Sequence, residues 1–406
     1  MLLDDVKIVS FCHFLQGPAA VQYLADMGAD VIKVEPIQGA HERHWSGANV
    51  FVGGVSGFFL CANRNKRSIA LDLKSDEGCK VAKSLISQAD IVVENFRPGV
   101  MDRLGLGYEE FKDVRPDLIF ASASGFGATG PDANRPGQDL LIQARAGLVA
   151  ATGNPKNLPS PVGCAAADQH GAALLAMGIL GAYVRRLKTN VGTWVEANLL
   201  NAGIDLQMEA LTNYASGNRP AQRFERQENL ATWFHEAPYG IYRTTNGAIA
   251  LSLNDPHELA KALQSEALTA LADADRHADR DQYAQAVADE VIRFSTPQIG
   301  HKLDTAKLWW APVCSYDDLL DDPQVLHNNV FQQIEINGEM ATLVSHPIRY
   351  DGEVMPIRHI ATSIGHDGIE ILNELGFSTS EIERLRSSGA VGLPQPADKS
   401  DSAQMA

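Results

Sequence analysis

Residues 6–34 read VKIVSFCHFLQGPAAVQYLADMGADVIKV, and this stretch indicates the fold. Val6 to Phe11 is a short apolar run typical of a buried strand, and Gly17-Pro18 interrupts the chain after it. A helical segment from Ala19 to Met27 follows, and Asp30 to Val34 is a second strand candidate. Because a strand, a helix and a strand in succession are typical of a parallel sheet, we expect an α/β fold.

The same alternation continues through the N-terminal half of the chain. We predict further strands at Ser68–Leu73, Ile91–Val93, Leu118–Ala121 and Thr193–Ala197, and helices at about 76–89, 99–114, 168–188 and 197–216. Strands that alternate with helices form a mostly parallel sheet covered on both faces. The sequence therefore predicts a large, Rossmann-like α/β lobe.

A change in composition marks a second lobe. With 406 residues the chain is too long for one simple core, and a polar connector begins near residue 217. Beyond it, Asn246-Gly247 joins two strand candidates and is a strong hairpin signal. We predict a large α/β lobe over 1–216 and 325–393, a small α+β lobe over 236–310, connectors at 217–235 and 311–324, and a disordered tail at 394–406.

Composition and charge exclude several classes of protein. Hydrophobic residues make up 45% and charged residues 21%, which is ordinary for a soluble globular protein. The formal net charge of −16 argues against nucleic acid or an anionic membrane as a partner. No apolar run is long enough to cross a bilayer, and the N-terminus does not resemble a secretory signal. The five cysteines are scattered without Cys-x-x-Cys spacing, so we expect a cytoplasmic protein with reduced thiols and no metal site.

A glycine motif at 125–130 imitates a dinucleotide-binding fingerprint. GFGATG matches Gly-x-Gly-x-x-Gly and follows a predicted strand. A true fingerprint also opens a helix whose N-terminus meets the pyrophosphate, and the next residues, PDANRP, do not begin a long helix. We therefore reject a nicotinamide cofactor and expect this loop to border another ligand.

The most informative candidate for catalysis is Asp168. Residues 161–171 read PVGCAAADQHG and lead into a long apolar helix, so small uncharged side chains precede this carboxylate. An accessible carboxylate near backbone N–H donors can act as a covalent nucleophile. The alternative is that Asp168 merely caps the helix, because Asp is a preferred N-cap residue. Local sequence alone favours the cap.

Basic residues flank the predicted strands of the N-terminal half. They fall in two groups: Arg64, Lys66, Arg67 and Lys74; and Arg97 and Arg103. If both groups converge on the edge of the sheet where strands end, they suit phosphate groups; otherwise they are ordinary solvated charges. His13, just after the first strand, is either a ligand-binding or acid–base group or a buried histidine with satisfied hydrogen bonds.

Taken together, several segments resemble the family III CoA-transferases, the carnitine and bile-acid-inducible group that includes formyl-CoA transferase. The segments are Gly17-Pro18, Met27–Pro36, Asn65–Lys74, Glu94–Gly99, Asp102–Gly105, Ser124–Gly127 and Ala167-Asp168, with weaker matches at Trp310–Val313 and Asp322–Val325. They stand in order and with family-like spacing over most of residues 1–200.

This resemblance implies a site and a set of substrates. Asp168 takes the position of the catalytic aspartate, and His13 borders the same site. The resemblance further implies a CoA-binding cleft along Leu71, Asp72, Leu73, Lys74, Asn95, Phe96, Arg97 and Arg103, and Gln138 and Asp139 are candidates for lining the acyl pocket. The substrates would be an acyl-CoA and a small carboxylic acid, with no tightly bound cofactor. The family also implies an interlocked homodimer.

The family mechanism predicts that Asp168 forms a mixed anhydride and then an enzyme-bound CoA thioester. Backbone N–H groups around Asp168 and Gly171 are candidates for stabilising the oxyanions.

The sequence departs from the family pattern at two places. Residues 231–237, ATWFHEA, lack the glycine run that closes the site in the formyl-CoA transferase branch. Racemases of the same fold carry a catalytic His where this chain has Gln138, and an amide cannot exchange a proton at neutral pH. This favours a transferase over an α-methylacyl-CoA racemase. A CoA hydrolase and a non-catalytic acyl-CoA binding protein remain alternatives.

Overall fold

The computed structural model describes residues 1–153, 158–217 and 224–393, and the predicted disordered tail lies outside them. The chain divides into two compact units. The first contains Met1–Ile142, Ala165–Gly203 and Leu326–Ala406, and the second contains Gln143–Cys164 and Ile204–Val325. Residues 143–164 and 204–216, which the sequence analysis assigns to the large lobe, lie in the second unit, where the Gln207 side chain donates to the carbonyl oxygen of Ala146 at 3.0 Å.

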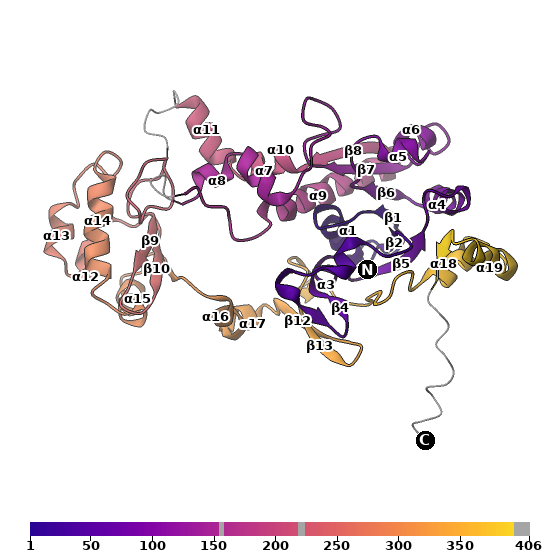
Figure 1. The fold of residues 1–406 in the computed structure, drawn as a ribbon. Coiled ribbons are helices and arrows are strands. Elements are labelled where there is room, and N and C mark those ends of the chain that lie inside the picture. The colour runs from indigo at the N-terminus through magenta and orange to yellow at the C-terminus, as the bar shows by residue number, and fades with distance from the viewer. Residues whose placement is uncertain (154–157, 218–223, 394–406) are drawn as a thin grey trace, which may run out of the picture. The chain divides into compact units, whose positions relative to one another are not determined.

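The first unit is built on a seven-stranded sheet in the order β16-β5-β2-β1-β6-β7-β8 (Figure 1). The strands are β1 (Lys7–Phe11), β2 (Asp30–Glu35), β5 (Lys66–Leu71), β6 (Ile91–Glu94), β7 (Ile119–Ser124), β8 (Thr193–Asn198) and β16 (Val391–Gly392). All pair in parallel except β16, which is antiparallel to β5. The chain order reverses between β1 and β6, the position at which open α/β sheets bind ligands.

Helices cover both faces of this sheet, as the alternation predicts. One face carries α1 (Gln16–Asp26) and α9 (Ala166–Thr189); the other carries α4 (Asp76–Gln88), α5 (Val100–Arg103), α6 (Tyr108–Phe111), α18 (Gly368–Glu374) and α19 (Thr379–Ser387). Successive side chains of a strand point to opposite faces. Accordingly Ile8 packs in the core with α1 and α9, whereas Val9 packs in the core with α4 and α18.

Two predicted long helices are wrong. Residues 99–114 form the two short helices α5 and α6, which the segment Leu104–Gly107 separates. Residues 197–216 form α10 (Leu199–Asp205) and α11 (Met208–Ser216), because Gln207 between them has a non-helical backbone. The predictions for α4, α9 and β8 are confirmed to within a few residues.

Smaller elements complete the first unit. They are α2 (His41–His44), the 3₁₀ turn η1 (Gly47–Asn49), β3 (Phe51–Val52), β4 (Val55–Ser56), α3 (Gly57–Ala62), β12 (Phe331–Ile336), β13 (Glu339–Val344), β14 (Arg349–Tyr350) and β15 (Glu353–Val354). The helix α7 (Asp139–Arg145) begins in the first unit and ends in the second. The pairs β3–β4, β12–β13 and β14–β15 are antiparallel hairpins.

The second unit has its own antiparallel sheet and core. Its sheet has the order β11-β10-β9, and the hairpin predicted at Asn246-Gly247 is confirmed because β9 and β10 pair antiparallel across it. Tyr242, Ile249 and Val287 lie in its core. The elements are α8 (Leu148–Ala151), α11 (Met208–Ser216), β9 (Gly240–Arg243), β10 (Ala248–Leu251), α12 (Pro256–Leu263), α13 (Glu266–Ala270), α14 (Arg280–Val291), α15 (Thr296–Thr305), β11 (Trp310–Pro312), α16 (Tyr316–Asp321) and the first residues of α17 (Pro323–His327).

Candidate active site

The turns after β1 and β6 meet at the switch point of the sheet. Asn95 accepts a hydrogen bond from the His13 backbone N–H at 2.9 Å, and its amide donates to the His13 carbonyl oxygen at 2.8 Å. The rings of His13 and Phe96 lie 5.4 Å apart. The structure therefore brings three of the predicted residues together. Burial lowers the pKa of His13, so its half-buried imidazole is neutral near pH 7.

The predicted CoA-binding segments converge on the same edge of the sheet. Leu73, Phe96 and Leu104 pack against one core cluster, although Leu73 follows β5 and the other two follow β6. Asp72 accepts a hydrogen bond from the backbone N–H of Lys74 at 3.0 Å and so shapes the turn after β5. Leu71 is the last residue of β5 and is buried.

Three cations at this edge are available to a ligand. Lys74, Arg97 and Arg103 are exposed. Throughout residues 1–153, 158–217 and 224–393, no side chain forms a hydrogen bond or ion pair with any of these three. They can therefore reach the phosphates of a ligand, and arginine can do so in bidentate fashion.

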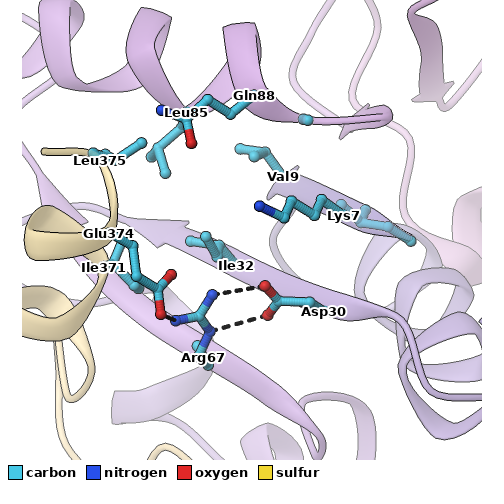
Figure 2. A pocket seen from close by; sticks show the side chains of 12 residues that line it. Lys7, Val9, Asp30, Ile32, Arg67, Leu85, Gln88, Ile371, Glu374 and Leu375 are labelled. Carbon is cyan, nitrogen blue, oxygen red and sulfur yellow. Dashed lines mark hydrogen bonds and ion pairs between the residues drawn. The ribbon is translucent and has the colours of Figure 1, made fainter. Parts of the chain in front are cut away.

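The other three members of the first basic group do not lie at this edge, so of the two alternatives left open above, convergence holds for Lys74 but not for Arg64, Lys66 and Arg67. Arg64 forms a buried ion pair with Asp26 at 2.7 Å, and the side-chain nitrogen of Lys66 donates to backbone carbonyls such as that of Pro18 at 2.7 Å. Arg67 binds Asp30 at 2.7 Å and Glu374 at 2.8 Å (Figure 2). Arg64 precedes β5, and Lys66 and Arg67 begin it, whereas ligand-binding loops follow the carboxyl ends of strands.

Asp168 lies in the first turn of α9, where another carboxylate performs the capping. Asp139, the first residue of α7, accepts hydrogen bonds from the backbone N–H groups of Ala167 at 2.8 Å and Asp168 at 3.1 Å. Asp139 therefore caps α9, the role that the sequence analysis considered as the alternative for Asp168. The carboxylate of Asp168 is half-buried and, in the part of the chain that the structure describes, has no hydrogen-bond partner.

This environment changes the acidity of Asp168. Burial raises the pKa of Asp168 to about 7, and the charge of Asp139 adds to this effect. A carboxylate with a raised pKa is a stronger nucleophile than an ordinary one, and near neutral pH much of it is still ionised. Asp168 is therefore a half-buried carboxylate that is partly protonated near neutral pH.

Gln16 is a site residue that the sequence analysis missed. It is the first residue of α1 and only 4% exposed, and within the described residues its amide nitrogen has no hydrogen-bond partner. A Cβ atom on Gly171 would lie 2.8 Å from that nitrogen, so the amide rests directly against α9. Gly171 shares a helix face with Asp168, three residues earlier. The available signal was an amide at the start of a helix whose other early residues are small or apolar.

The glycine loop after β7 positions the remaining candidates. Gly125 follows β7, and a Cβ atom on it would lie 2.6 Å from the Cα of Gly137, so the two backbones touch. This contact brings the exposed Gln138 and the half-buried Asp139 beside the end of β7. Between Gly130 and α7 the structure has no long helix, which agrees with the rejection of a dinucleotide fingerprint.

The five cysteines are unpaired in the structure, and within the described residues no group of His, Cys, Asp and Glu is arranged to hold a metal ion. In the same residues, none of the helices combines the length and the apolar character needed to span a membrane.

Comparisons with known proteins agree with this geometry. The model of CoA-transferase family III matches residues 3–367. Succinyl-CoA:glutarate CoA-transferase of Homo sapiens is 30% identical over 400 residues, covering 96% of this chain and 90% of the relative. Succinyl-CoA:mesaconate CoA-transferase of Haloarcula hispanica is 31% identical over 394 residues, covering 93% and 97%. A CAIB/BAIF family protein from Brucella suis has a similar structure, with a TM-score of 0.79, 28% identity and coverage of 92% and 98%.

The family match and the relatives cover nearly the whole chain and define its class. The chain belongs to CoA-transferase family III and is a CoA-transferase.

Proposed function

We propose that this enzyme transfers CoA from an acyl-CoA to a carboxylic acid through covalent intermediates on Asp168. The single observation that carries the mechanism is the state of this carboxylate. It is half-buried with a pKa raised to about 7, and Asp139 has taken over the capping of its helix. A carboxylate that only stabilised the helix would instead bind those N–H groups itself.

The reaction follows from a carboxylate nucleophile. The Asp168 carboxylate attacks the thioester carbonyl carbon, forming a mixed anhydride as the C–S bond breaks and CoA leaves as a thiolate. The thiolate attacks the aspartyl carbonyl, which forms an aspartyl–CoA thioester and releases the donor acid. The acceptor carboxylate attacks that thioester, which forms a second mixed anhydride between Asp168 and the acceptor and expels the CoA thiolate. The thiolate then attacks the acceptor carbonyl of this anhydride. This last step releases the new acyl-CoA and restores the carboxylate.

Gln16 is the donor best placed to stabilise the oxyanions. The backbone N–H of Asp168, which the sequence analysis considered for this role, already donates to Asp139. The amide nitrogen of Gln16 is buried, lacks a partner in the described residues and rests against Gly171. A donor without a ground-state partner is free to bind an oxygen that becomes negative only during the reaction.

The free cations define how CoA binds. We assign Lys74, Arg97 and Arg103 to the phosphates of CoA, and the turns at 71–73 and 95–96 to the rest of the CoA molecule. His13, Gln138 and Asp139 border the reacting end, where Asp139 also orients α9 through the hydrogen bonds to its first turn.

The names of the relatives suggest which carboxylic acids exchange CoA in this reaction. Two of them use succinyl-CoA as donor and pass CoA to glutarate or mesaconate, which are dicarboxylic acids. We propose succinyl-CoA and short dicarboxylates as the first substrates to assay. The interlocked homodimer that the family resemblance implies stays part of the proposal.

Trapping of the covalent intermediate tests this function. Wild-type enzyme incubated with succinyl-CoA and then hydroxylamine is expected to carry a hydroxamate on Asp168, seen by peptide mass spectrometry. Asp168→Ala is expected to lose both the adduct and the transfer of CoA. An unlabelled Asp168 together with full activity of Asp168→Ala would refute the proposal, and proton exchange at the α-carbon without an acceptor would indicate a racemase.

A further inference from the structure

A buried ion pair lies directly behind the turn that joins β1 to α1. Lys33 of β2 and Glu42 of α2 are 2.9 Å apart and only 2% and 0% exposed. Burial by itself would raise the pKa of Glu42, but Lys33 and its hydrogen bonds hold that pKa below its ordinary value. Glu42 is therefore ionised although it is buried.

Each member of the pair also forms a hydrogen bond with the backbone of the turn. The Lys33 ammonium donates to the carbonyl oxygen of Cys12 at 2.7 Å, and Glu42 accepts from the backbone N–H of Phe14 at 3.3 Å. Asn95 binds the N–H and carbonyl of His13 between them. Four consecutive backbone polar groups of the turn, from the Cys12 carbonyl to the Phe14 N–H, are thus bound by side chains from other elements.

The turn needs this support because its conformation is unfavourable. Phe14 has a φ of 60°, in the left-handed region that non-glycine residues rarely adopt. Such a conformation persists only where the surrounding contacts determine it, and these residues cluster at functional sites. Two residues later the chain enters α1 at Gln16, so the path of the turn sets where the Gln16 amide points.

We propose that Lys33 and Glu42 are positioning residues, which fix the turn at 12–14 and thereby aim the Gln16 amide at the reacting centre. This inference rests on the proposed role of Asp168 and Gln16. A buried ion pair contributes little to stability compared with apolar side chains of similar size, whereas it can enforce one conformation. The same two elements supply a neighbouring pair, Glu35 and Arg43, which is equally buried but does not contact the turn.

A double replacement separates positioning from folding. Lys33→Met/Glu42→Met removes both charges at similar volume, so the enzyme is expected to fold with a melting temperature close to the wild type. Its kcat is expected to fall at least about tenfold because the amide is misaligned, while KM for acyl-CoA stays unchanged. The matched control, Glu35→Met/Arg43→Met, should retain kcat.

A second measurement asks whether the effect passes through Gln16. In a Gln16→Ala background the Lys33/Glu42 replacement is expected to have little further effect on kcat, because the group that it positions is already missing. An unchanged kcat in the Lys33/Glu42 variant, or an equal fall in the Gln16→Ala background, overturns the proposal. So does an equal fall in the Glu35/Arg43 control.

If the double variant does not fold, Glu42→Gln tests the proposal instead, because it keeps the side-chain volume but weakens the hydrogen bond from the Phe14 N–H. A lowered kcat with an unchanged KM supports the proposal, and an unchanged kcat overturns it. Labelling of Asp168 in the wild type is read independently, so failure of the proposed function is recognised separately.

Discussion

Replacing Asp139 by Asn tests why Asp168 is so weakly acidic. The Asn side-chain oxygen can still accept hydrogen bonds from the N–H groups of Ala167 and Asp168, which Asp139 binds at 2.8 and 3.1 Å. The start of α9 is therefore preserved, and only the negative charge beside the nucleophile is removed. Any change in the acidity of Asp168 then reports the electrostatic effect of that charge.

The structure limits the size of this change. The pKa of Asp168 rises from 3.8 to about 7, and burial is the larger cause, with the charge of Asp139 second. The shift is about 3 units, so Asp139 accounts for less than half of it and Asp139→Asn should lower the pKa by at most about 1.5 units. The direction is fixed, because removing a like charge favours the ionised carboxylate.

The pH dependence of kcat/KM measures this pKa in the free enzyme. For the wild type, kcat/KM is expected to rise with pH and level off above about 7, since only the ionised Asp168 is a nucleophile. In Asp139→Asn the rising limb should move to lower pH. Asp255→Asn is the matched control, because Asp255 caps α12 in the second unit by accepting from the N–H groups of His257 and Glu258. If the rising part of the kcat/KM–pH profile does not shift in Asp139→Asn, or shifts equally in the control, this reasoning is refuted.

Three further predictions follow from the same site. Because the folded-state pKa of Asp168 exceeds its unfolded value of 3.8, ionisation destabilises the fold as pH rises toward about 7. Asp168→Asn should therefore abolish turnover yet stabilise the protein above neutrality. The gain in the free energy of unfolding is up to about 4 kcal/mol, because the pKa shift is about 3 units and each unit corresponds to about 1.4 kcal/mol. A gain in melting temperature that does not grow with pH would contradict this prediction. Gln16→Leu removes a buried amide without a partner in the described residues, so we expect stability to rise by about 1 kcal/mol while kcat falls roughly a hundredfold, and a retained kcat would count against the oxyanion role. Arg103→Ala should raise KM for acyl-CoA roughly tenfold with little change in kcat. Arg67 is the control: its partners are Asp30 and Glu374, so Arg67→Ala should lower the melting temperature and leave KM unchanged. Equal KM values for the two variants would contradict the assignment of Arg103 to the CoA phosphates.

The sequence predicted those features that local patterns determine. The period of apolar residues located β1, β2 and β6, and small residues before an apolar helix singled out Asp168. The proline-rich segment after the glycines at 125–130 correctly excluded a dinucleotide-binding helix. In each case the deciding signal lies within about ten residues of the element it predicts.

Features that depend on distant partners could not be predicted in this way. Arg67 looks like a free cation in sequence, but Glu374, more than three hundred residues away, binds it. The helix cap of α9 comes from Asp139 on another helix rather than from the residue before α9. Whether Gln16 has a partner depends on how α1 packs against α9. The position of a residue in the chain does not contain this information.

The capping of α9 by a charged residue bears on reactivity. An uncharged cap at Ala165, such as Ser or Asn, would satisfy the same N–H groups. Asp139 also places a negative charge near Asp168 and uses the donors that would otherwise stabilise its ionised form. Both effects keep the nucleophile basic, and both make its ionised state costly to the fold. The stability gain expected from Asp168→Asn reports the whole cost of ionising Asp168, in which burial is the larger part, whereas the pKa shift expected from Asp139→Asn reports only the part that comes from the Asp139 charge. If Asp168→Asn stabilises the protein and Asp139→Asn leaves the pKa unchanged, burial alone controls this carboxylate.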